Sequence, residues 1–222
     1  MESPTGDKVM EKESKRLKTL AAFTFLLAPL FAWGSILASN ETAVFASLSR
    51  MIWFSGSSVR IFIAMLVLLG PMLVSFFLAH DISCISKPQK FYLRMCMTVS
   101  CAVLYIGAMW IMPSDGNTMT SENIWHGVLS FGGMVMIFLT YCFYTLLIRR
   151  ADRDGTTLLT SFLIFSLVTG AFAVLNIFDD KSYVIASAVS ELYFLTMMSV
   201  IGYLCYYLAY RNRKVSNKEN SL

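Results

Sequence analysis

Charged residues are scarce in this chain of 222 residues. Aspartate, glutamate, lysine and arginine make up only 14% of the sequence, whereas hydrophobic residues make up 56%, and the mean hydropathy is +0.62. A soluble domain cannot bury so much apolar surface, so the composition predicts an integral membrane protein. The net charge of +4 gives no argument for nucleic acid, because the cations flank apolar segments. We therefore expect no nucleic-acid partner.

Residues that bind metals and nucleotides are also scarce. The two histidines, His80 and His126, and the five cysteines show no zinc-ligand spacing, and no glycine-rich phosphate loop is present in the sequence. We expect no cofactor and no bound metal. The cysteines fall outside the loops predicted below to be lumenal, so no structural disulfide is expected. They are Cys84, Cys96, Cys101, Cys142 and Cys205.

Six long apolar segments dominate the chain and are separated by short polar gaps. Each is long enough to cross about 30 Å of hydrocarbon as a helix. The first exceeds the apolar core of a signal peptide, so we expect it to be retained. The predicted fold is all-α, a polytopic membrane bundle of six transmembrane helices over residues 18–210, between a disordered tail (1–17) and a second tail (211–222). The predicted helices are 18–38, 60–79, 92–112, 124–148, 156–178 and 183–210.

Lysine and arginine gather in every second gap between these segments. Four groups, within residues 8–18, 87–94, 149–153 and 211–218, hold 15 of the 18 basic residues. The positive-inside rule assigns that side to the cytosol, so both termini are predicted to be cytosolic. The gap at 149–155 mixes arginine with aspartate, and we expect it to be a solvated hairpin.

The predicted first lumenal loop, 39–59, carries the sequon Asn40-Glu41-Thr42. Asn40 is therefore a candidate glycosylation site, although it lies only about two residues from the membrane span. The middle of the loop, 43–54, is apolar. It could form a short helix at the membrane interface or a loop packed on the lumenal end of the bundle.

Glu191 is the acidic residue that the sequence places well inside a span. It lies about 12 Å below the lumenal end of the last helix at 1.5 Å per residue. A charge there is costly, so Glu191 should face the bundle interior or a wet cavity. His126, Asn176 and Arg60 are expected near the same depth, and the four predict a pocket for a polar or lipid headgroup. The alternative is a contact between helices, with Glu191 neutral or paired to Arg60 or His126.

Two other chemistries have weaker support in the sequence. Ser130 follows His126 by four residues, so the two could share a helix face as the dyad of an intramembrane acyl hydrolase or transferase. Such pairs also arise by chance. A transporter would be expected to have helices that are broken at matching places in the two halves of its chain. Pro29 and Pro71 break the first two helices, but the last three contain no proline.

Three segments resemble a known family, the lipid-remodelling factors of glycosylphosphatidylinositol (GPI) anchors, and in particular the second post-GPI-attachment factor. They are residues 60–77, with Gly70-Pro71; 122–140, with Trp125-His126; and 188–193, with Ser190-Glu191. The related DRAM autophagy modulators also have a histidine at the start of the fourth helix and a Ser-Ala-x-x-Glu pattern like that of 187–191. Met72 departs from the remodelling branch, which has an arginine after this proline.

The resemblance implies a lipid-handling accessory protein in GPI-anchor maturation, acting on fatty-chain exchange in the Golgi or endoplasmic reticulum. The implied partner is a membrane lipid or a GPI-anchor headgroup, with other membrane proteins as further partners. An accessory role is favoured over an enzymatic one, and no catalytic residue is assigned. The DRAM branch implies instead a regulator of lysosomal or autophagic membranes that acts through protein contacts.

Overall fold

The computed structural model describes the backbone of residues 4–37, 58–82, 85–109, 121–178 and 183–219. Side chains are described mainly within 10–35, 65–81, 85–108, 124–170 and 191–216. Every element in this part of the chain is a helix, which confirms the all-α class. The elements are α1 (Pro4–Ala22), the π-helical η1 (Phe23–Leu27), α2 (Ala28–Leu37), α4 (Ser58–Ile82), α5 (Lys87–Met109), α6 (Ser121–Ile148), α7 (Arg153–Phe178) and α8 (Tyr183–Glu219).

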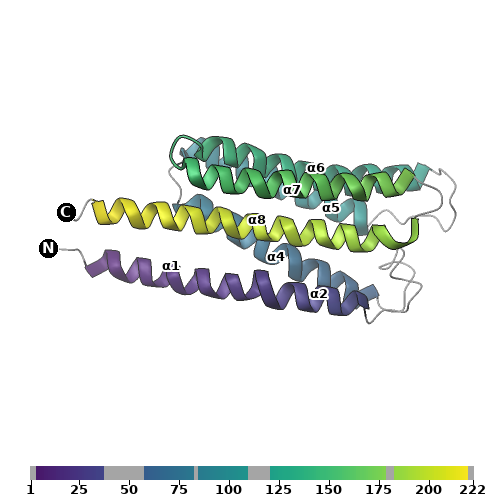
Figure 1. The fold of residues 1–222 in the computed structure, drawn as a ribbon, viewed down its shortest axis with the longest axis horizontal. Helices are drawn as coiled ribbons and strands as arrows, with labels where there is room; N and C mark the ends of the chain where they lie inside the picture. The colour runs from purple at the N-terminus through teal and green to yellow at the C-terminus, as the bar shows by residue number, and fades with distance from the viewer. Residues whose placement is uncertain (1–3, 38–57, 83–84, 110–120, 179–182, 220–222) are drawn as a thin grey trace.

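The helices run alternately up and down one long axis (Figure 1). α1 begins and α8 ends at one end of the bundle, where the turn between α6 and α7 also lies; we call this the terminal end. The opposite, distal end holds the last residues of α2, α5 and α7 and the first of α4, α6 and α8. α8 packs against α4 and α7, α5 packs along α6, and α2 packs on α4.

Several helices are long and apolar enough to cross a membrane. Large apolar side chains are exposed on their outer faces, among them Leu30 (64%), Leu146 (62%) and Leu167 (57%). Such faces suit a lipid environment, so the described part has the features of a polytopic helical membrane protein. Within the described residues, the four long stretches are Met10–Ser35, Lys87–Ala108, Ile124–Ile148 and Glu191–Ser216, and Met65–Asp81 is a shorter one.

The first helix begins much earlier than the sequence predicts. Residues 4–17 were expected to be disordered, but α1 begins at Pro4. Lys15 pairs with Glu11 at 2.7 Å, and such pairs four residues apart stabilise a helix. The sequence did not predict this early start because it depends on a tertiary contact, in which Glu13 is buried against α8. At the other end α8 continues to Glu219, so most of the predicted second tail is helical.

Pro29 is accommodated by a wider helical turn just before it. Proline has no N–H to donate and its ring crowds the carbonyl four residues earlier. Here the Ala28 N–H bonds to the Phe23 carbonyl, five residues back, and residues 23–27 form a π-helical turn. The first span thus continues through its proline into α2 without a break in the helix.

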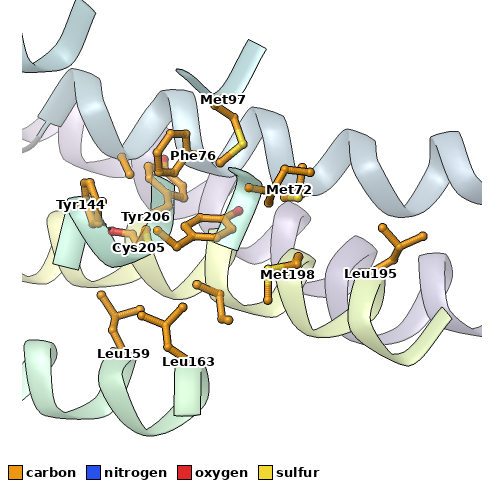
Figure 2. Close-up of a cluster of buried hydrophobic side chains, with 14 of the residues drawn as sticks. Met72, Phe76, Met97, Tyr144, Leu159, Leu163, Leu195, Met198, Cys205 and Tyr206 are labelled. Atoms are coloured by element: carbon orange, nitrogen blue, oxygen red, sulfur yellow. Dashed lines mark hydrogen bonds between the residues drawn. The ribbon is translucent and has the colours of Figure 1, made fainter. Parts of the chain in front are cut away.

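Glycine allows the helices to approach closely. A Cβ atom on Gly133 would lie 2.5 Å from the Leu104 nitrogen, and one on Gly107 would lie 2.5 Å from the Ser130 nitrogen. α5 and α6 therefore touch backbone to backbone, as small residues permit between membrane helices. The buried core takes residues from α2, α4, α5, α6, α7 and α8 and includes Met97, Tyr144 and Tyr206 (Figure 2).

Candidate functional site

The four residues predicted to line a headgroup pocket lie in four different helices. Arg60 is the third residue of α4, His126 the sixth of α6, Asn176 the third from the end of α7 and Glu191 the ninth of α8. Because the helices alternate in direction, all four positions belong to the distal end (Figure 1). At 1.5 Å per residue they lie within about 12 Å of their helix ends.

Glu191 and His126 are the members of this set whose side chains the structure describes. Both are partly exposed. α6 and α8 contact each other and both contact α7, so adjoining helices carry the two residues. The side chains of Arg60 and Asn176 lie outside the described residues, as do Asn40 and the apolar stretch 43–54.

The buried face of α8 below Glu191 is apolar. Leu192, Leu195 and Met198 are each at most 1% exposed. A carboxylate at the edge of such a core is stable only with water, a hydrogen-bond donor or a bound polar group beside it. The distal end of α8 therefore places an acceptor at the boundary between a polar end and an apolar interior.

The structure gives no hydrogen bond from the Ser130 hydroxyl to the His126 ring. The Ser130 hydroxyl is buried and has no hydrogen-bond partner among the described residues. Its backbone nitrogen faces Gly107 in the tight contact between α5 and α6. The intramembrane acyl hydrolase or transferase, which needs an activated nucleophile, stays a prediction.

The terminal end holds a buried acidic residue that the sequence analysis missed. Asp152 was expected in a solvated hairpin, but its side chain is only 6% exposed. Its carboxylate accepts hydrogen bonds from Arg211 (2.9 and 2.7 Å), from the Asn212 amide (2.9 Å) and from the Gly155 N–H (2.7 Å). The solvated-hairpin prediction is therefore wrong at Asp152, although Arg149, Arg150 and Arg153 are exposed.

The pKa of Asp152 reflects two opposing effects. Burial raises the pKa of the carboxyl group, but the hydrogen bonds from Gly155, Asn212 and Arg211 and the charge of Arg211 lower it by more, so the pKa falls below its ordinary value. A sequence signal was present here. Asp152 directly precedes α7, and an aspartate at that position commonly caps the N–H three residues later, which is Gly155.

Further polar contacts surround this cluster. Glu13 of α1 accepts a short hydrogen bond from the Tyr206 hydroxyl of α8 and one from Arg16 at 2.9 Å. His80 is fully buried, with Nδ1 2.5 Å from the Phe76 carbonyl oxygen. The contact of Glu13 with Tyr206 connects α1 to α8, and the His80 ring packs on the Tyr144 ring of α6 with centroids 5.4 Å apart. These contacts are best understood as structural, since Glu13, His80 and Tyr206 are buried.

The two histidines are too far apart to share a metal ion. His80 and His126 lie at opposite ends of the bundle. The described residues contain no group of three or more histidine, cysteine, aspartate or glutamate side chains that could hold a metal ion.

Comparison of the chain with protein-family models, with curated proteins and with solved structures finds no match.

Proposed function

We propose that this protein crosses the membrane six times with both termini in the cytosol. Fifteen of its 18 basic residues lie in the four groups on the side of the termini. The starts of α1, α5 and α7 and the end of α8 belong to the terminal end. Excess positive charge marks the cytosolic side, so the terminal end is assigned to the cytosol and the distal end to the lumen.

At the lumenal end, the protein handles lipid headgroups as an accessory factor in the maturation of GPI anchors in the Golgi or endoplasmic reticulum. The observation that carries this proposal is the common placement of Glu191 and His126. Both are partly exposed at the distal end of adjoining helices. The choice of GPI anchors over other lipids comes from the resemblance of the segments that contain these two residues.

The chemistry of Glu191 fits a ligand-binding role. An acidic side chain inside a membrane span costs about 2.5–3.5 kcal/mol on the mildest scale, and such residues commonly mark a functional site. A serine or threonine could connect two helices at a smaller cost. A carboxylate can accept hydrogen bonds from the hydroxyl or amino groups of a glycolipid headgroup, and His126 can donate to its phosphate. Asn176 and Arg60 would complete the site.

The test is lipid analysis of GPI-anchored proteins from cells that lack this protein. Wild type, Glu191→Gln, His126→Ala and Glu219→Gln are re-expressed at equal levels, and the anchor fatty chains are measured by mass spectrometry. Glu219→Gln is the matched control, because it makes the same chemical change at the other end of α8. We expect altered chains in the deleted cells and rescue by wild type and Glu219→Gln, but not by the two distal variants.

Unchanged anchor chains in the deleted cells would overturn the GPI proposal. Location then decides the next hypothesis, since a lysosomal protein whose loss changes autophagy would favour the DRAM-like regulator. Normal rescue by Glu191→Gln and His126→Ala would retain the pathway but remove the proposed site.

A further inference from the structure

An open groove of about 640 Å³ lies between α1 and α4. Lys12, Lys15 and Arg16 of α1 line one part of it. Leu20 of α1, with Val74 and Leu78 of α4, lines another. The groove thus joins a cationic region to an apolar one, a combination that suits an amphiphile with an anionic head.

The apolar wall of the groove is open to its surroundings. Val74 is 49% exposed, and Leu78, four residues later on the same face of α4, is partly exposed. Both belong to the apolar stretch Met65–Asp81. Leu20 is likewise only partly buried and lies within the first candidate span. A hydrocarbon chain lying on these three residues would cover apolar surface that the bundle leaves uncovered.

The cationic wall is held in place by a buried contact. Arg16 donates to Glu13, which also accepts from Tyr206 of α8, so this turn of α1 is fixed against the bundle. Lys12 and Lys15 are exposed beside it. Glu11 also lines the groove and pairs with Lys15 at 2.7 Å, but both side chains are more than 60% exposed. Exposed pairs of this kind are weak, so a phosphate can compete for Lys15.

We propose that this groove binds an anionic glycerophospholipid of the cytosolic leaflet. Its phosphate and any further headgroup anion lie against Lys12, Lys15 and Arg16, and one acyl chain follows Leu20, Val74 and Leu78. This leaflet supplies the ligand because it is rich in anionic lipid, and because the basic residues lie in the first turns of the candidate span Met10–Ser35, at the end that the proposed topology assigns to the cytosol. The site is at the opposite end of the bundle from Glu191, and its occupancy does not depend on the GPI proposal.

The test uses the full-length protein, purified and stripped of lipid in a neutral detergent. Phosphatidylserine and phosphatidylcholine with the same acyl chains are titrated separately, and bound lipid is counted by native mass spectrometry. Each basic residue near a membrane surface strengthens binding of anionic lipid about fivefold. We expect Lys12→Gln with Lys15→Gln to weaken phosphatidylserine binding at least tenfold, while phosphatidylcholine binding changes little. Lys87→Gln with Arg153→Gln, which removes two exposed charges outside the groove, should leave both affinities unchanged.

Two further variants separate this site from general charge attraction. Glu11→Gln removes the competing carboxylate and should strengthen phosphatidylserine binding severalfold. Val74→Trp should block the apolar wall and weaken phosphatidylserine binding. Val168→Trp, at a similarly exposed position on α7, should leave phosphatidylserine binding unchanged. Thermal unfolding of each variant confirms that it is folded.

Equal phosphatidylserine binding by wild type and Lys12→Gln/Lys15→Gln would overturn the proposal. So would equal losses in the groove variant and the Lys87/Arg153 control, which would indicate a diffuse charge effect. Disruption of a dimer by Val74→Trp with phosphatidylserine binding intact would also overturn it, by assigning the groove to a second copy of the chain.

Discussion

The guanidinium group of Arg211 donates hydrogen bonds to both carboxylate oxygens of Asp152, at 2.9 and 2.7 Å. This pair joins the turn before α7 to the last part of α8, 59 residues apart in sequence. Both bonds come from a single nitrogen, Nη2, and the Asn212 amide donates a third bond to the same carboxylate. These charge-assisted bonds connect the end of α8 to the turn before α7.

Removing the charge of Asp152 should destabilise the protein. Asp152→Asn deprives Arg211 of its charged partner and weakens the cap on Gly155. Loss of hydrogen bonds at a shielded charged group lowers the free energy of unfolding by about 1–3 kcal/mol. We expect a clearly lower midpoint of thermal unfolding in detergent. Asp154→Asn, at an exposed position two residues later, should change stability by less than about 0.5 kcal/mol. Equal melting of the two variants would show that the pair contributes nothing.

The same pair predicts a dependence of stability on pH. The folded-state pKa of Asp152 is lowered, so its contribution is full above the unfolded-state pKa of about 3.9 and is lost as the pH falls through the folded-state pKa. The difference in melting temperature between wild type and Asp152→Asn should therefore be constant near neutrality and shrink below about pH 4. A difference that grows on acidification would contradict the assigned direction.

The contact between Tyr206 and Glu13 should hold α1 against α8. Tyr206→Phe removes the hydroxyl that donates to the buried Glu13 carboxylate, which then keeps only Arg16 as a described donor. We expect faster hydrogen exchange and faster tryptic cleavage in α1, whose local stability should fall by about 1–3 kcal/mol. Tyr207→Phe is the matched control, because Tyr207 is adjacent and 39% exposed. Equal exchange rates in both variants would exclude this role for Tyr206.

Neighbouring glycines in α6 should respond oppositely to alanine. At Gly133 the new methyl group would lie 2.5 Å from the Leu104 backbone of α5, so Gly133→Ala must push the two helices apart. This overpacking should lower the free energy of unfolding by about 1–3 kcal/mol. At Gly132 nothing lies within 4 Å, and alanine favours the helix. Thermal unfolding should therefore show a loss for Gly133→Ala and no loss for Gly132→Ala. A reversal of that order would show that α5 and α6 pack differently.

Apolar runs in the sequence predicted the helices well, because twenty consecutive apolar residues leave few alternatives in a membrane. The helix predicted over 124–148 is observed as Ser121–Ile148, and that predicted over 156–178 as Arg153–Phe178. Helix ends were missed where they depend on contacts between distant residues. α1 extends to Pro4 beside the contact of Glu13 with Tyr206, which no local pattern indicates.

The candidate site was predictable in its placement but not in its contacts. The depth of Glu191 and His126 follows from helix length and direction alone. Which side chains meet depends on helix rotation, which an almost uniformly apolar sequence does not specify. The burial of Asp152 was missed for a related reason, because its partners, Arg211 and Asn212, come from the end of α8. Arg60, Asn176 and the sequon at Asn40 remain predictions.

Photo-crosslinking can show whether Glu191 and His126 contact a lipid headgroup at the distal end of the bundle, which is proposed to face the lumen. A photoactivatable GPI precursor is added to membranes containing the full-length protein, and the labelled peptides are identified by mass spectrometry. We expect labelling near the starts of α6 and α8. Glu191→Gln should reduce this labelling at least tenfold, which corresponds to loss of one hydrogen bond to a charged group. Glu219→Gln should leave the labelling unchanged. Equal labelling of wild type and Glu191→Gln would show that Glu191 does not bind the headgroup.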